Sequence, residues 1–196
     1  MTLRDGYHSV PQGKLAAVQT SLEMRERPPL RPSPQGAWSL ERLAEPDLAR
    51  HRALIHRVGD DYLWALRLML SDAELEAFLR EPRVEIYSLA TSRGDEGILE
   101  LDFRGERVCE LSLFGVAKPL IGTGAGRWLM NRGIEIAWSH PIDRFWVHTC
   151  SLDHPSALSF YERSGFRPFK REVEIYPDPR VLGLCPRESA PHVPIL

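Results

Sequence analysis

The stretch LIGTGAGRWLM, at positions 120–130, places three glycines at alternate positions directly before a predicted helix, and Arg127 follows the last glycine. The first amides of a helix have no partners within it and carry the positive end of its dipole, which favours bound anions. Gly122, Gly124 and Gly126 would let phosphate oxygens approach those amides without meeting a Cβ atom. The loop therefore predicts a phosphate-bearing ligand. The alternative is a glycine-rich turn packed against its own sheet.

Two familiar phosphate-binding loops fit this spacing poorly. A P-loop ends in Gly-Lys-Ser/Thr, whereas this loop ends in Gly126-Arg127-Trp128, which argues against a kinase or an ATPase. A dinucleotide-binding fold needs Gly-x-Gly-x-x-Gly and an acidic residue that closes the second strand. The first acid after the predicted strand at 144–150 is Asp153. A nucleotide-binding domain of the Rossmann type is therefore disfavoured, and it is kept as a third hypothesis.

The elements that must position the loop follow from hydrophobic periodicity. The early chain has helical spacing, and Ser71 with Glu74 forms a capping-box pattern; from residue 84 the period changes to two. A proline-rich stretch, RPPLRPSPQG, separates the first strand from the rest and predicts an extended linker. The predicted strands are 18–24, 37–43, 84–90, 97–103, 108–116, 144–150 and 169–176, and the predicted helices are 46–59, 71–80, a stretch ending near 138, and 154–165.

Alternation within the strands predicts which side chains share a face. One face of strand 108–116 is expected to hold Cys109, Leu111 and Leu113, and the other Glu110, Ser112 and Phe114. The segment 144–150 is almost continuously apolar, which predicts burial on both faces. Asp153 or His154 is expected to cap the helix that follows.

Length and composition predict one domain with a sizeable core. The chain has 196 residues, of which 43% are hydrophobic and 27% charged, and its formal net charge is −2. No strong positive charge recruits nucleic acid, no apolar run reaches the roughly 18–20 residues of a membrane span, and the N-terminus does not resemble a secretory signal. Cys109, Cys150 and Cys185 have neither disulfide nor zinc spacing, so we expect reduced thiols, no metal and a cytoplasmic location.

Two stretches resemble motifs of the GNAT N-acetyltransferases. ELSLFGVAKPLIGTGAGRWLM, at 110–130, is similar to the acyl-CoA-binding strand, loop and helix, and FWVHTCSLDHPSALSFYERSGF, at 145–166, is similar to the strand and short helix that carry the family tyrosine. The resemblance implies an α/β (α+β) fold with a mixed, mostly antiparallel, splayed sheet flanked by helices. The implied division is an N-terminal strand and linker at 1–36, the acetyltransferase domain at 37–180 and a tail at 181–196.

The resemblance also implies acetyl-CoA as cosubstrate. Its pyrophosphate would lie on the glycine loop, and its pantetheine arm would bond strand amides beside the splay, where Gly115 suits a close approach. Ile121 departs from the glutamine or arginine that the family often has, which removes one side-chain contact. The residues implied in coenzyme binding are Phe114, Gly115, Val116, Ile121, Gly122, Thr123, Gly124, Ala125, Gly126, Arg127, Asp153, Ala157 and Tyr161.

Acetyl transfer by direct attack of a primary amine needs a base and an acid for the leaving thiolate. The resemblance implies Glu110 as the base, and burial would raise its pKa; a solvent-facing glutamate and a water chain remain the alternatives. Glu100 and Asp102 are further candidates, and the hairpin register that would bring Asp102 beside Glu110 is left open. Tyr161 is implied as the acid, with a core aromatic as its alternative.

The acceptor is an amine of a small molecule or peptide that the sequence does not name. The resemblance places the acceptor site near the segment DDYLWALRLML, where Asp60, Asp61, Tyr62 and Trp64 could shape it. By analogy with the family, EVEIYPDPRVLGL, at 172–184, could mediate a homodimer. The alternative function is an acyl-CoA-binding sensor or interaction module without turnover.

Overall fold

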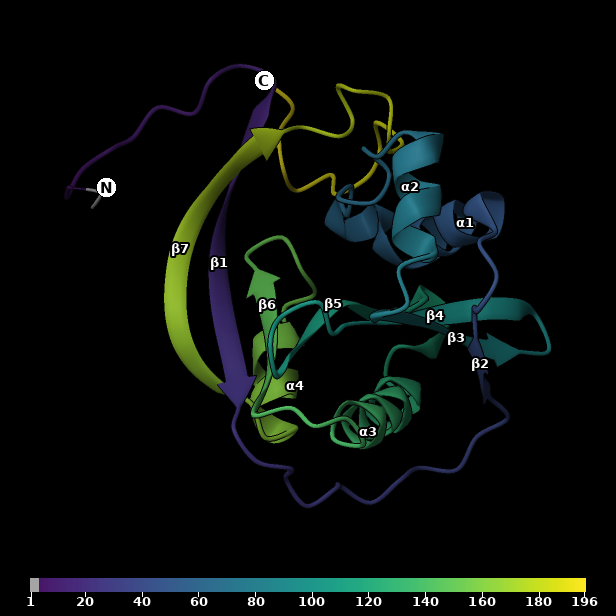
Figure 1. Ribbon diagram of the computed structural model, residues 1–196. Coiled ribbons are helices and arrows are strands. Elements are labelled where there is room, and N and C mark those ends of the chain that lie inside the picture. Colours follow the sequence, from purple (N-terminus) through teal and green to yellow (C-terminus); the bar gives the residue numbers. More distant parts are fainter. Residues whose placement is uncertain (1–3) are drawn as a thin grey trace.

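The computed structural model describes residues 4–196 and contains one open seven-stranded sheet in the order β2-β3-β4-β5-β6-β1-β7 (Figure 1). Every neighbouring pair is antiparallel except β5 and β6, which run parallel. The predicted mixed, mostly antiparallel sheet is confirmed, and a doubly wound parallel sheet is excluded. The strands are β1 (Lys14–Met24), β2 (Ser39–Arg42), β3 (Val84–Thr91), β4 (Gly94–Asp102), β5 (Val108–Val116), β6 (Arg144–Cys150) and β7 (Arg167–Pro177).

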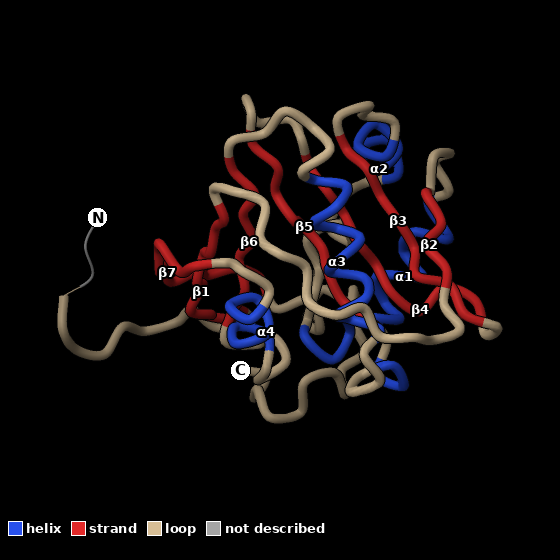
Figure 2. The backbone as a smooth tube through the Cα atoms, turned by 90° about the horizontal axis from the view of Figure 1, so that it is seen from below, coloured by secondary structure: helices blue, strands red, loops and turns tan. Residues whose placement is uncertain are grey.

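Helices cover both faces of the sheet, as the view along the other axis also shows (Figure 2). On one face lie α1 (Leu48–Gly59) and α2 (Asp72–Leu79), and on the other lie α3 (Ala125–Ala137) and α4 (Ala157–Arg163). Short 3-10 turns follow α1 at Asp60–Tyr62 and precede the glycine loop at Lys118–Leu120. Alternate residues of β4 face the two layers: Ile98 packs with α1, and Leu99 packs with α3.

The N-terminal strand β1 lies inside the sheet, where it pairs with β6 on one side and β7 on the other. After β1 the proline-rich segment 25–38, here named the strap, crosses the α3 and α4 face to reach β2 (Figure 2). The Asn131 side chain donates to the Arg31 carbonyl at 2.9 Å. Pro28 lies against Gly165, and Pro34 lies against Gly124. The strap therefore packs against the start of α3, where the predicted ligand site lies, and against the end of α4.

A β-bulge in β5 corrects the predicted strand faces. The register shifts between the pairs Glu100–Leu113 and Leu101–Leu111, so Ser112 is an extra residue. Cys109 and Leu111 share a face, as predicted, and pack with α3, but Leu113 packs on the other face with α1. The shift also turns Phe114 away from the face of Glu110, against Phe160 of α4.

The register question left open by the sequence is settled, because Asp102 pairs directly with Glu110. Strand β6 differs from its prediction. Phe145, Val147 and Thr149 are buried while His148 is exposed, so only one face of β6 lies in the core. The apolar run misleads because Trp146 faces the less covered side.

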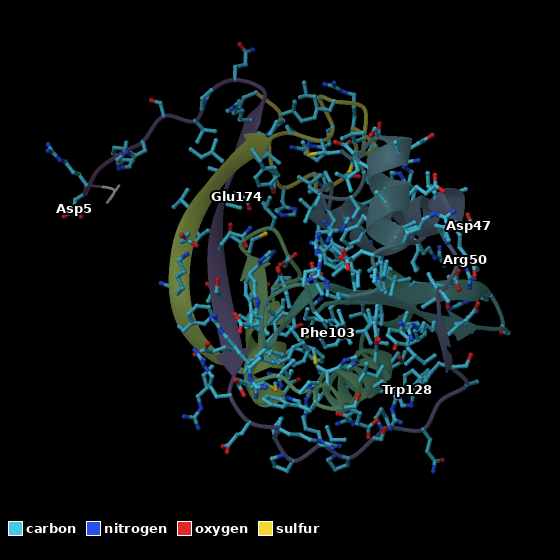
Figure 3. The ribbon with its side chains drawn as sticks, in the orientation of Figure 1. Asp5, Asp47, Arg50, Phe103, Trp128 and Glu174 are labelled. Atoms are coloured by element: carbon cyan, nitrogen blue, oxygen red, sulfur yellow. The ribbon has the colours of Figure 1, made fainter. Side chains whose placement is uncertain are left out.

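The helix starts show which local signals hold. Asp47 caps α1 by accepting from the backbone N–H of Arg50 at 2.9 Å, and the two residues lie together at the start of that helix (Figure 3). The predicted capping box of α2 is present. The predicted cap of α4 by Asp153 or His154 is wrong: Ser156 is the N-cap residue, and its side chain makes no capping bond.

The C-terminal segment lies on the α1 and α2 face (Figure 1). Arg180 bonds the Asp178 carboxylate through Nε at 3.0 Å and Nη2 at 2.8 Å, and its Nη1 donates to the carbonyls of Ser189, Ala190 and Val193. Both charged side chains are at least 97% buried, with exposed fractions of 1% and 3%. This pair folds the segment back on itself, so that Cys185 reaches the cluster around α1.

Within residues 4–196, the three cysteines are free and no helix is both long and apolar enough to cross a bilayer. Strand β7 forms one edge of the sheet and leaves Val173 and Ile175 exposed. Dimerisation through this region remains a prediction.

Replacing Arg180 by alanine is expected to lower the free energy of unfolding by about 3–5 kcal/mol, because it leaves the Asp178 carboxylate buried and unpaired. Urea unfolding of R180A beside R187A, which removes an exposed arginine of the same segment, measures this. Equal midpoints for the two variants would contradict the buried anchor.

Candidate active site

The central feature of the site is an opening in the sheet between β5 and β6. The two parallel strands pair from Val108–Arg144 to Leu111–Val147, after which β5 continues unpaired on this side to Val116. The bulge at Ser112 follows directly and bends β5 away from β6, as bulges do. Beyond it, backbone amides and carbonyls of β5 that would bond a neighbouring strand face the gap.

A cavity of about 460 Å³ passes through this opening. Its walls come from the end of β5, the glycine loop, the start of α4, the strap and the segment after α1, so elements from both faces of the sheet line it. The predicted coenzyme residues that line it are Phe114, Gly115, Val116, Ile121, Gly122, Gly124, Gly126, Arg127, Asp153, Ala157 and Tyr161.

Thr123 and Ala125 do not line the cavity, although the sequence predicted both. The Thr123 hydroxyl donates to the Leu120 carbonyl at 2.7 Å and accepts from the Ala125 N–H at 3.3 Å. Ala125 is fully buried against α3's own core. These two residues hold the conformation of the loop on the side away from the cavity, and the residues next to them face the cavity.

Glycine suits the positions in the loop for two separate reasons. Gly122 and Gly124 have φ of +81° and +96°, in the left-handed region that favours glycine, and Gly124 is the N-cap of α3. Gly126 lies in ordinary helical backbone, and a Cβ atom added there would meet nothing within 4 Å. Space is therefore left beside the first turn of α3, where free amides favour an anion.

Three arginines from distant parts of the chain meet at this end of the cavity. They are Arg31 of the strap, Arg127 of α3 and Arg163 at the end of α4. Burial and the neighbouring positive charges of Arg127 and Arg163 lower the pKa of Arg31. Arg127 Nε is buried and has no hydrogen-bond partner among the residues described. This concentration of positive charge, with one unused donor, suits a ligand that carries several phosphate charges.

The sequence analysis named Arg127 but missed Arg31 and Arg163. Arg163 had a usable signal, since it ends the short helix that the second motif contains. No sequence signal indicated Arg31, because the position of a proline-rich segment depends on the surfaces that it packs against. Four further wall residues were not predicted: Val58, Leu120, Ser156 and Phe160.

Asp153 organises the side of the opening that β6 leaves. Its carboxylate accepts from the Thr149 hydroxyl at 2.7 Å, from the Cys150 N–H at 2.8 Å and from the Trp64 indole N–H at 2.9 Å. Asp153 therefore ties the turn after β6 to the segment after α1. This explains why it does not cap α4.

Aromatic side chains form the wall on the α4 side. Phe114 stacks on Phe160, with ring centroids 5.6 Å apart, and meets Tyr161 edge-on at 6.2 Å. Burial, and to a smaller extent the charge of Asp153, raise the pKa of Tyr161. Its hydroxyl therefore stays protonated at neutral pH, which is the state an acid requires.

Glu110 lies on the α1 and α2 face of β5, outside the walls of the cavity and about 13 Å along the strand from Phe114. Asp102 of β4 is the cross-strand partner of Glu110, and Nδ1 of His148 on β6 lies 3.8 Å from Oε1 of Glu110. Burial and the negative charge of Asp102 raise the pKa of Glu110 to about 7. A carboxylate with this pKa is suited to accept a proton near neutral pH.

Glu100 is used otherwise. It is fully buried and paired with Arg67, whose Nη2 lies 2.6 Å from its Oε1. This pair fixes the segment between α1 and α2 on the sheet. Asp60 and Asp61, predicted near the acceptor, contact His56 and Lys118 instead, whereas Tyr62 and Trp64 line the cavity.

In the part of the chain from residue 4 onward, no cluster of three or more histidine, cysteine or acidic side chains is arranged to hold a metal ion.

Comparison with known proteins agrees with this geometry. Residues 90–166 match the family model described as "Acetyltransferase (GNAT) family". The matched segment holds β4, β5, the glycine loop, α3, β6 and α4, which build the opening. No curated protein matches the chain.

Solved structures share the fold at low sequence identity. A tandem GNAT protein from the clavulanic acid biosynthesis pathway aligns with a TM-score of 0.60 and 14% identity, over 87% of this chain and 55% of that one. A GCN5-related N-acetyltransferase from Sphaerobacter thermophilus aligns with a TM-score of 0.58 and 12% identity, over 87% and 53%. An aminoglycoside acetyltransferase from an uncultured soil metagenomic sample, in complex with trehalose, aligns with a TM-score of 0.55 and 18% identity, over 71% and 95%.

The resemblance to the GNAT acetyltransferases is therefore confirmed: residues 90–166 match that family's model, and the sheet has the GNAT fold. Members of this family are acyltransferases. The chain spans little more than half the length of the tandem protein and of the Sphaerobacter enzyme.

Ionisation of Glu110 is expected to destabilise the folded protein as the pH rises. The folded state holds this proton up to about pH 7, whereas an unfolded glutamate releases it near about pH 4.3. Between about pH 5 and pH 8 the free energy of unfolding of the wild type should therefore fall by on the order of 2 kcal/mol relative to that of Glu110→Gln. Urea unfolding at both pH values measures this, with Glu106→Gln, at an exposed position of the adjacent turn, as the control. Parallel pH dependence in all three proteins would contradict the raised pKa.

Proposed function

We propose that this protein is an acetyl-CoA-dependent N-acetyltransferase that transfers the acetyl group to a primary amine by direct attack. The observation that carries the proposal is the cavity, which is lined by the glycine loop on one face of the sheet and by Val58, Tyr62 and Trp64 on the other. Family membership of the segment 90–166 supports acyl transfer, and the cavity supports a long ligand that is anionic at one end and passes between strands.

The residues present fit coenzyme A. Gly122 and Gly126 leave space beside the amides at the start of α3, and Arg31, Arg127 and Arg163 supply the charge that the ligand's phosphates need. The unpaired edge of Phe114, Gly115 and Val116 suits an extended amide-containing arm that bonds like an added strand. When bound, the coenzyme supplies a thioester carbonyl that an amine can attack.

In this proposal Glu110 accepts the proton that the attacking amine must lose, through water that fills the distance along β5. Burial, together with the negative charge of Asp102, keeps the pKa of Glu110 high enough for that task. Tyr161 donates a proton to the departing thiolate, so that the amide bond forms as the thioester bond breaks. The chain needs no nucleophile of its own in this direct mechanism.

The acceptor is proposed to be an amine of a small molecule or a peptide. The α1 and α2 face of the sheet, which we propose as the acceptor side, carries Glu110, and its ionised carboxylate attracts a protonated amine. The adjacent Asp102 is paired with Arg104. One structural neighbour is an aminoglycoside acetyltransferase, which makes polyamine-like small molecules reasonable first candidates to test.

Coenzyme binding is tested by thermal unfolding with acetyl-CoA, CoA, NAD or ATP. A ligand that binds the folded protein, present at about a hundred times its dissociation constant, adds roughly 2.7 kcal/mol to the free energy of unfolding, which raises the melting temperature by several degrees. Acetyl-CoA and CoA should stabilise the wild type and the other two ligands should not. Gly126→Leu should remove the effect, because its side chain fills the space beside α3. Arg132→Leu, on the same helix but away from the cavity, should keep it.

Catalysis is tested by thiol release from acetyl-CoA with a panel of primary amines. Glu110→Gln should lower kcat about 10²–10⁴-fold and should abolish the rise in rate through about pH 7 that the wild type shows. Glu106→Gln should leave both unchanged. Binding of acetyl-CoA without thiol release for any amine would favour the alternative, an acyl-CoA-binding module without turnover.

A further inference from the structure

On the α1 side of the sheet, Val58, Tyr62 and Trp64 line the cavity. Trp64 and Val58 come from the α1 face, whereas the arginines come from the strap, α3 and α4 on the other face. The cavity therefore runs through the sheet from the arginines towards Trp64. A ligand whose phosphates lie at the arginines has its other end near this ring.

The Trp64 ring lies across the opening in the sheet. A Cβ atom added to Gly115 would lie 2.9 Å from Cη2 of Trp64 and 2.7 Å from Cγ1 of Val58, so the ring edge rests directly on the β5 backbone. On the other side, the indole N–H donates to Asp153 at 2.9 Å, and Asp153 is itself bonded to the end of β6. The ring thus bridges the two strands that separate.

Several contacts hold this ring in place. Leu63, just before it, is buried in left-handed backbone with φ of 58°, and the Trp64 N–H donates to the Gly59 carbonyl at 3.2 Å. A Cβ atom on Gly59 would lie 2.7 Å from the Cβ of Trp64, so the two segments touch. The buried pair of Arg67 with Glu100 anchors the same segment to β4. Trp64 is therefore a stiff wall of the cavity.

We propose that Trp64 determines acyl-chain specificity, and that it restricts the cavity to thioesters of acetyl and similarly short acyl groups. Because Trp64 lies against Gly115 and lines the cavity, an acyl group carried to this end of the cavity would meet the ring. A chain with several more methylenes has to occupy the volume of the indole. It meets a ring that can leave only by breaking the bond to Asp153. This inference rests on the proposed function, since it deepens the same coenzyme site.

The test is the binding of CoA, acetyl-CoA, butyryl-CoA and octanoyl-CoA, measured by isothermal titration calorimetry on the full chain. The wild type should bind octanoyl-CoA at least about tenfold more weakly than acetyl-CoA. Trp64→Ala should bring octanoyl-CoA to within about threefold of acetyl-CoA or tighter, while the affinity for free CoA changes less. Leu66→Ala is the matched control, because Leu66 lies in the same segment with 57% of its surface exposed; it should keep the wild-type order.

Trp64→Phe covers the case in which the alanine variant fails to fold. It keeps an aromatic ring but loses the donor to Asp153 and part of the volume, so butyryl-CoA should gain affinity over the wild type. A wild type that binds octanoyl-CoA as tightly as acetyl-CoA overturns the inference and leaves the proposed function standing. A wild type that binds neither CoA nor any thioester overturns the proposed function itself.

Discussion

The departure of β5 from β6 after the Leu111–Val147 pair is the constraint around which the rest of the molecule is arranged. Separated strands expose backbone groups that need partners, and an apolar core cannot provide them. Glycines, aromatic rings and arginines line the gap. The proposed ligand, with amide groups and phosphates, would supply the missing partners. The bulge at Ser112 accompanies the departure and moves Leu113 and Phe114 to the layers opposite those that strict alternation along β5 predicts.

Two distant segments close the opening from opposite faces. The strap brings Arg31 to the glycine loop, and its prolines rest on Gly124 and Gly165, where a side chain would collide with them. The segment after α1 brings Trp64 to Gly115, and Asp153 holds it there. The proposed binding and specificity therefore rest on contacts between parts of the chain that lie far apart in sequence and that the sheet holds together.

Local signals in the sequence were sufficient for the glycine loop, the capping box of α2 and the order of the elements, because each is encoded within a few neighbouring residues. The raised pKa of Glu110 was foreseeable from its strand position. The bulge was not foreseeable from the sequence, since one extra residue moves every later side chain of the strand to the other face without changing the composition. Two further features could not be predicted from the sequence: the position of β1 between β6 and β7, and the position of Arg31 at the site. Long-range strand pairing and packing decide both.

Amide hydrogen exchange of the full chain, with and without acetyl-CoA, tests most directly whether the opening in the sheet is a coenzyme site. The account predicts slower exchange in the presence of acetyl-CoA at the end of β5, from Phe114 to Val116, and at the loop from Gly122 to Gly126. The strap around Arg31 should be protected with them. Unchanged exchange at all three places, or protection confined to the opposite edge at β2 and β3, would contradict it.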